Sequence, residues 1–358
     1  MSIIRLLILS AALAAAAAAA SDGDAQERSR IQHALAAPTA SQYAREISSS
    51  GQERDASALL ASLVRIEQDP DLESTARTVL LHDALVALAG TPPDPDALPF
   101  LRRHADAPRV VRAWHEDEGH RVAIDAYDTG AAARYAMREW RRAETREATL
   151  AALEQHSWRA DASDMVSGIE DAFAAAPVAH VAAARSEIIA GLEAGLPLEV
   201  VALTAALRNS DSDLAARVVD HGRAHVVLHA LGDIASGFPA QDAFMLMTLA
   251  SEREDIGAAA VAQAGRWSPS LPAARGWLLA RLGDPRLGTA AAHALSRDPG
   301  AISALEDLLA AAGALTRNRA ALALYLNGSG SARDALSHAL ERESLPDDLR
   351  GNISIWLR

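Results

Sequence analysis

The chain has 358 residues, no cysteine and a formal net charge of -13 at pH 7. The absence of thiols excludes a disulfide framework and a cysteine-ligated zinc site. The excess of acidic residues argues against a nucleic-acid-binding protein, which needs a basic surface. Alanine supplies 83 residues, all 34 basic residues are arginine, and only 4% of the chain is aromatic. Because alanine favours helices and typical strand residues are scarce, the composition predicts a helical fold.

Residues 1–20 have the features of a secretory signal peptide. Arg5 supplies a positive charge, residues 6–13 are apolar, and residues 18–20 are the small residues expected before a cleavage site. The alternative is a retained membrane anchor, but the apolar run over residues 6–20 is 15 residues long, and spanning a bilayer takes about 20. Cleavage would leave 33 arginines and 47 acidic residues, a net charge of -14. We therefore expect a periplasmic or secreted protein without stable membrane insertion.

Turn-forming residues divide the rest of the chain into short segments. In the first third these are Pro38, Gly51, Asp69–Pro70, Gly90–Pro93 and Ala107–Pro108. Between them the apolar residues recur at helical spacing. Residues 21–114 are therefore predicted to form an N-terminal helical block.

Residues 115–160 depart from this pattern. The stretch over residues 115–130 is charged and contains two glycines, so it is predicted to be a loop between helices. The charged residues 138–147 are typical of a solvated helix. We interpret 115–160 as a charged loop and a connecting helix, and the loop as a candidate functional segment.

Residues 161–358 are predicted to form a block of repeated helices with almost no sheet. One apolar stripe consists of Leu287, Ala290, Ala291, Ala294 and Leu295, and a second follows 45 residues later over residues 332–340. Asp284–Pro285 and Asp298–Pro299 fit helix starts, which suggest a repeat of 31 residues instead. Short loops force neighbouring helices to run antiparallel, and stacked antiparallel pairs form an α-solenoid. The repeat length, 31 or 45, stays open.

One segment carries a resemblance to a known family. The run RGWLLARLGDPRLGTAAAHALSRDP, residues 275–299, resembles the short bacterial HEAT repeat, the type also seen in phycobilisome lyases. The matching residues are Arg275, Leu282, Gly283, Asp284, Pro285, Arg286, Leu295 and Asp298. The resemblance is clearest over 275–343 and partial elsewhere. It implies an all-α, HEAT-like solenoid that acts as a binding scaffold, and it carries over no catalytic residue.

Two histidine groups are candidate metal ligands. His115, Glu116 and His120 invite comparison with the zinc-protease motif, but their histidines are five residues apart where the motif requires four. His221, His225 and His229 have i, i+4, i+8 spacing, which would place them on one helical face. His221 and His225 could then share one metal ion, whereas His229 would lie about 12 Å further along than His221.

The remaining polar residues form no recognisable catalytic arrangement. Asp125, Tyr127 and Asp128 could serve acid–base or ligand roles, but no nucleophile pairs with them, and Asp128 is equally suited to helix capping. No nucleophile elbow and no glycine-rich phosphate loop is present in the sequence. We expect no cofactor.

Three functional hypotheses follow. The first is a non-catalytic scaffold of the bacterial cell envelope that binds a protein or peptide in the groove of stacked helix pairs. The second is a metal-dependent hydrolase that uses the histidines at 115–120 or 221–229. The third is an immunity-like protein whose acidic concave face sequesters a basic secreted enzyme.

Overall fold

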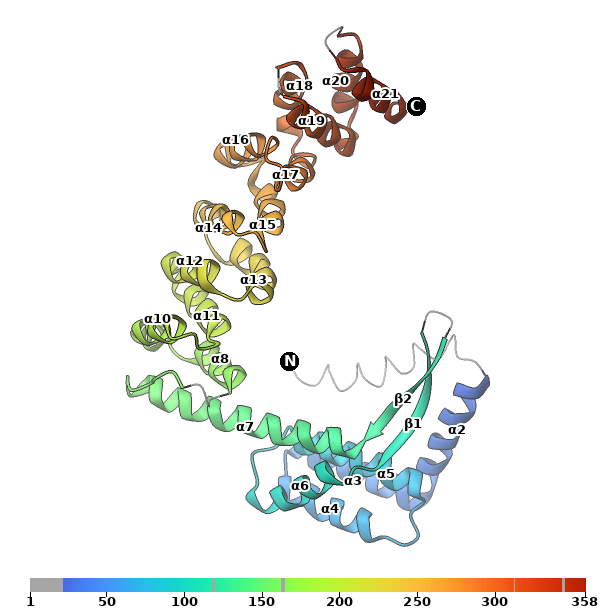
Figure 1. Cartoon of the computed structure of the whole chain (residues 1–358). Coiled ribbons are helices and arrows are strands. Elements are labelled where there is room, and N and C mark those ends of the chain that lie inside the picture. Colours follow the sequence, from blue (N-terminus) through green and yellow to red (C-terminus); the bar gives the residue numbers. More distant parts are fainter. Residues whose placement is uncertain (1–21, 118–119, 162–164, 312, 343–344) are drawn as a thin grey trace. The chain divides into compact units, whose positions relative to one another are not determined.

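The computed structural model describes residues 22–117, 120–161, 165–311, 313–342 and 345–358, and it is almost entirely helical (Figure 1). The predicted signal peptide lies outside these residues. The chain divides into two compact units, residues 1–147 and residues 148–358. No helix in the described ranges is both long enough and apolar enough to cross a membrane.

The first unit is built on five helices and the first part of a sixth. Their bounds are α2 Asp22–Ala36, α3 Pro38–Glu53, α4 Ala56–Gln68, α5 Ser74–Leu88, α6 Leu98–Asp106 and α7 Thr129–Glu154. α5 is the central helix, since eight of its residues are buried and it contacts α2, α3 and α4. The indole N–H of Trp140 on α7 donates to the carbonyl of Leu88 at 3.0 Å, which ties α7 to the end of α5.

A β-hairpin, not a loop, occupies most of the charged segment. Strand β1 (Val110–Asp117) pairs antiparallel with β2 (His120–Asp128), and the register shifts between Val111 and Arg112. The predicted loop at 115–130 is therefore wrong. An isolated two-stranded hairpin is marginal in water, and here both strands contact α5 while β1 also contacts α2. Buried Val111 packs with Ile31 and Val79 at this contact.

The second unit contains α8 to α21, shown in chain order from green to red in Figure 1. The helices are α8 Val166–Ala175, α9 Val178–Ala183, α10 Arg185–Glu193, α11 Glu199–Asn209, α12 Ser212–His221, α13 Ala224–Gly237, α14 Ala240–Glu252, α15 Gly257–Ala264, α16 Pro272–Arg281, α17 Gly288–Leu295, α18 Ile302–Ala311, α19 Ala314–Asn327, α20 Gly330–Leu340 and α21 Asp347–Trp356. Short connections join them, and small residues at many of the buried positions allow neighbouring helices to approach closely.

The helices of this unit alternate between two rows. The odd row consists of α11, α13, α15, α17, α19 and α21, and each of its members contacts the next member as well as its sequence neighbours. The even row consists of α12, α14, α16, α18 and α20. Even-row helices begin at residues 212, 240, 272, 302 and 330, which are 28 to 32 residues apart. The shorter predicted repeat therefore describes the spacing, because the 45-residue match compares α17 of one row with α20 of the other.

Arginines link each repeat to the one before it. Arg208, Arg253, Arg286 and Arg319 donate to main-chain carbonyls at or just after the ends of α8, α12, α14 and α16, respectively. The last three of these arginines are 33 residues apart. The last four carbonyls of a helix have no partner within it, and the helix dipole favours a positive charge there. These capping arginines satisfy groups that helix packing would otherwise leave unpaired.

Candidate functional site

The three histidines predicted to share one helical face lie on two helices. His221 is the last residue of α12, whereas His225 and His229 lie on α13. The break occurs at Gly222, which has an extended backbone, and a Cβ there would lie 2.5 Å from the carbonyl oxygen of Val218. The prediction of one continuous face is therefore wrong.

The polar contacts of these histidines are local. All three side chains are exposed. His221 Nε2 lies 3.3 Å from Asp220 Oδ2, and His229 Nδ1 lies 2.7 Å from the carbonyl oxygen of His225. Within the described ranges, no group of three or more His, Cys, Asp or Glu side chains is arranged to hold a metal ion.

The other candidate residues lie on the hairpin. His115 pairs with Val122, and Asp117 with His120, in the strand register. The side chains of residues 114–122 lie outside the described part of the structure. Asp128 Oδ1 accepts hydrogen bonds from the backbone N–H groups of Gly130 and Ala131 at 2.8 and 3.0 Å, so Asp128 caps the start of α7.

Asp125 and Tyr127 also have structural contacts. Asp125 Oδ1 accepts a hydrogen bond from Arg112 Nε at 3.1 Å, and both side chains are exposed. The ring of Tyr127 is half-buried and meets His82 edge to face, with ring centroids 5.3 Å apart. Burial, followed by the charge of Asp83, raises the pKa of Tyr127, which therefore stays protonated at neutral pH. The two residues do not form an acid–base pair.

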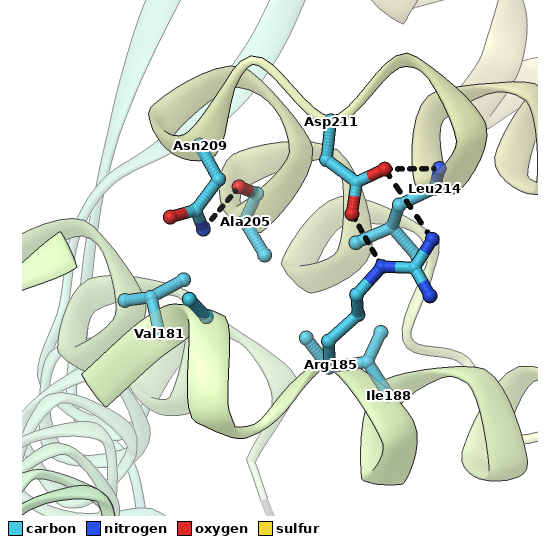
Figure 2. A pocket seen from close by; sticks show the side chains of 8 residues that line it. Val181, Arg185, Ile188, Ala205, Asn209, Asp211 and Leu214 are labelled. Carbon is cyan, nitrogen blue, oxygen red and sulfur yellow. Dashed lines mark hydrogen bonds and ion pairs between the residues drawn. The ribbon is translucent and has the colours of Figure 1, made fainter. Parts of the chain in front are cut away.

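A small cavity between α10 and α12 contains an ion pair (Figure 2). Arg185 Nε donates to Asp211 Oδ2 at 2.5 Å, and Asp211 Oδ1 accepts from the backbone N–H of Leu214 at 2.9 Å. The hydrogen bond from Arg185 keeps the pKa of Asp211 below its usual value, against the opposing effect of burial. The cavity has a volume of about 50 Å³, space for a few water molecules. We assign this pair a structural role, because both charged groups already have their partners.

The exposed side chains of the odd row form a second candidate site. α13, α15 and α17 each present one exposed stripe, and because neighbouring odd-row helices are in contact, the stripes lie side by side. Together with the turns directly after α15 and α17 they form what we call the odd-row face. Its exposed members are His225, Leu228, His229, Asp233, Ser236, Ala258, Ala262, Arg266, Thr289, His293 and Arg297.

The odd-row face differs in charge from the chain as a whole. It contains Arg266 and Arg297, three histidines and a single carboxylate, Asp233. The exposed charged side chains of α12, α14 and α18 in the even row are mostly carboxylates: Asp213, Asp220, Glu252 and Asp307, alongside Arg217. An acidic binding face is therefore not found on α13, α15 and α17; the face is weakly basic within a chain of net charge -13.

One titratable side chain of the first unit is buried without hydrogen bonds. His104 on α6 is 3% exposed, and neither ring nitrogen has a hydrogen-bond partner in the described ranges. Its Nε2 lies 3.6 Å from Glu67 Oε1, and its ring packs 4.4 Å from that of Phe100. Burial lowers the pKa of His104, although the charge of Glu67 acts in the opposite direction.

We expect His104 to make the first unit less stable in mild acid. The unfolded chain takes up a proton near the ordinary histidine pKa of 6.5, whereas the folded chain does so only at lower pH. Unfolding is therefore favoured as pH falls below about 6.5. Hydrogen–deuterium exchange over α6 should accelerate between pH 7.5 and 5.5 after correction for intrinsic exchange. His104→Phe should weaken that acceleration, and exposed His293→Gln should leave it unchanged; an unaltered pH response in His104→Phe would refute the assignment.

Comparison with protein-family models, with curated proteins and with solved structures gives no match to this chain. The candidate sites therefore rest on the geometry and charge of its own residues.

Proposed function

We propose that the chain is a non-catalytic binding protein of the bacterial cell envelope, an α-solenoid of HEAT type, and that it binds an acidic segment of a protein partner. Support for the solenoid comes from helix pairs at 28- to 32-residue intervals and from continuous contacts along the odd row. Repeat proteins of this kind bind along the extended surface that stacked repeats create. The leader-like sequence at residues 1–20 supports the location.

The charge of the odd-row face is the observation that carries the proposal. Arg266 and Arg297 lie at corresponding positions after α15 and α17, and His293 lies between them along the row. Small side chains at Ala258 and Ala262 leave the surface of α15 low. Complementary charge speeds encounter and selects between partners. An acidic partner fits this face and is repelled by the carboxylates elsewhere on the chain.

A site-specific photo-crosslinking experiment tests the face directly. A photoreactive amino acid replaces Ala262 on the odd row or Asp307 on the even row of the full chain, and native cells expressing each variant are irradiated. We expect a discrete adduct from position 262 whose partner carries an acidic segment, and none from position 307. Adducts from position 307 alone, or a basic partner at position 262, would overturn the proposal.

Charge reversal of the same face should weaken the complex with that crosslinked partner. Arg266→Glu with Arg297→Glu should lower the affinity about tenfold or more, because two attractive contacts become repulsive. The matched control reverses exposed even-row arginines, Arg217→Glu with Arg333→Glu, which makes the same change in net charge. Added salt should weaken the wild-type complex as well. Equal losses in the two double variants would show that net charge, not this face, determines binding.

A further inference from the structure

The second unit contains a larger polar pocket near its N-terminal end. The end of α7, the turn that follows it, α9 and α10 surround a cavity of about 210 Å³. Its lining residues are Leu153, His156, Trp158, Arg159, His180, Ala183, Ala184, Ser186 and Glu187. All of them belong to the second unit, and none lies on the odd-row face.

Trp158 contributes a buried donor that has no partner. The side chain is 4% exposed, and its ring is held edge to face against Phe173 with centroids 5.0 Å apart. The indole Nε1 has no hydrogen-bond acceptor in the described ranges. Leaving a buried N–H unpaired destabilises a fold, and buried tryptophans normally have a partner for this group. The unpaired N–H of a residue that lines a cavity indicates a ligand that accepts a hydrogen bond.

The other polar groups of the pocket are mainly donors. The rings of His156 and His180 meet edge to face with centroids 5.4 Å apart, and no hydrogen bond is formed by either ring in the described part of the chain. Ser186 adds a hydroxyl group. His156 has a left-handed backbone, with φ of 53°, directly after α7. Because a residue other than glycine seldom adopts this conformation, the local fold holds His156 at the pocket at a conformational cost.

Glu187 supplies the one carboxylate of the lining. Its Oε2 lies 3.7 Å from Arg159 Nε, a distance at which the charges attract but no hydrogen bond forms. Arg159 also donates to the main-chain carbonyl of Trp158 at 2.8 Å. The carboxylate of Glu187 therefore retains acceptor capacity toward the cavity.

We propose that this pocket binds the α-carboxylate and the α-ammonium group of a small amino acid. The carboxylate accepts hydrogen bonds from the Trp158 indole N–H and the neighbouring imidazole and hydroxyl groups, and the ammonium group pairs with Glu187. Pockets for drug-sized ligands have about 300–1,000 Å³, so about 210 Å³ restricts the ligand to a small molecule or to the last residue of a peptide. In a peptide terminus the amide N–H replaces the ammonium group as donor.

The indole N–H of Trp158 provides a direct readout. The full chain, labelled with ¹⁵N and with the Trp158 indole signal assigned through Trp158→Phe, is titrated with glycine, with glycinamide, with free trialanine and with C-terminally amidated trialanine. We expect the Trp158 indole signal to shift with glycine or with free trialanine, which identifies the source, and to remain unchanged with the two amides. No shift with either free carboxylate, or equal shifts with the amides, would overturn the proposal.

Two variants connect the shift to the pocket. Trp158→Phe keeps an aromatic ring against Phe173 but removes the N–H, so the calorimetric affinity for the shifting ligand should fall about tenfold. Glu187→Gln should weaken binding of glycine in particular, because it removes the charge that pairs with the ammonium group. Trp267→Phe, at a second buried tryptophan in the same unit, should leave the affinity unchanged. Wild-type affinity in Trp158→Phe with its fold intact would contradict the assignment.

Discussion

Replacing Asp298 by alanine is expected to lower the free energy of unfolding of the second unit by about 3–5 kcal/mol, because it removes one partner of a buried ion pair. Asp298 is 1% exposed. Its Oδ2 accepts from Arg275 Nε and from Ser268 Oγ, both at 2.6 Å, and its Oδ1 accepts from the backbone N–H of Gly300 at 2.9 Å. One carboxylate thus joins the start of α16 to the turn before α18.

Denaturant unfolding of the full chain, followed by circular dichroism, measures this loss. Asp307→Ala, which removes an exposed carboxylate from α18, is the matched control and should change the free energy of unfolding by less than about 0.5 kcal/mol. A similar small change in Asp298→Ala would show that water replaces the lost contacts.

The same carboxylate predicts a dependence on pH. Burial raises the pKa of Asp298, but hydrogen bonds from Arg275 and Ser268 outweigh it and bring the pKa below the ordinary 3.8. The contribution of Asp298 to stability is therefore fully present above the unfolded pKa of about 3.8 and is lost as pH falls through the lower folded pKa. Wild type and Asp298→Asn should converge in stability in strong acid.

Replacing Arg319 by methionine is expected to destabilise the second unit by about 1.5–3 kcal/mol, the usual range for hydrogen bonds to a charged group. Its guanidinium donates to the carbonyl oxygens of Leu282 and Pro285 at 3.0 and 3.1 Å, and also to that of Asp284. Methionine keeps much of the apolar stem, so the loss reports on the carbonyls left without a donor. Thermal unfolding of Arg319→Met and of the exposed control Arg297→Met should separate the two, and equal melting temperatures would exclude a capping role.

Gly288 offers an independent test of the same contact. A Cβ at this position would overlap the guanidinium of Arg319 and lie 2.6 Å from the carbonyl oxygen of Leu282. Gly288→Ala should therefore destabilise the chain, although alanine is the better helix former. The effect should diminish in the Arg319→Met background, because the main steric conflict is then removed.

Some features of this structure are readable from local sequence. Asp284 and Asp298 were predicted to cap helix starts, and each accepts backbone hydrogen bonds in the turn that follows it. In the two predicted apolar stripes, Leu287, Ala291, Ala294 and Leu295 are buried, as are Ala332, Ala335, Leu336 and Ala339. Helical period and capping chemistry depend on residues a few positions apart, so one chain segment contains the whole signal.

Other features depended on contacts between distant residues. The hairpin was missed because its strands are charged and short of regular alternation, and they are stabilised by packing on α2 and α5. The histidine stripe failed at Gly222, where close approach of neighbouring side chains leaves no space for a Cβ. His156 and His180 are 24 residues apart, so no local spacing joins them.

The sequence by itself therefore determined that the chain is helical, where several of its helices begin and which of their faces are apolar. Only the tertiary structure decided which exposed stripes lie side by side, so that Arg266, His293 and Arg297 share one face, and that Trp158 lines a cavity with an unpaired donor. The physical reason is range. A helix forms through hydrogen bonds and side-chain spacing within a few residues, whereas a binding surface depends on how each helix is rotated against partners roughly 30 residues away in the chain, as the repeat spacing sets them.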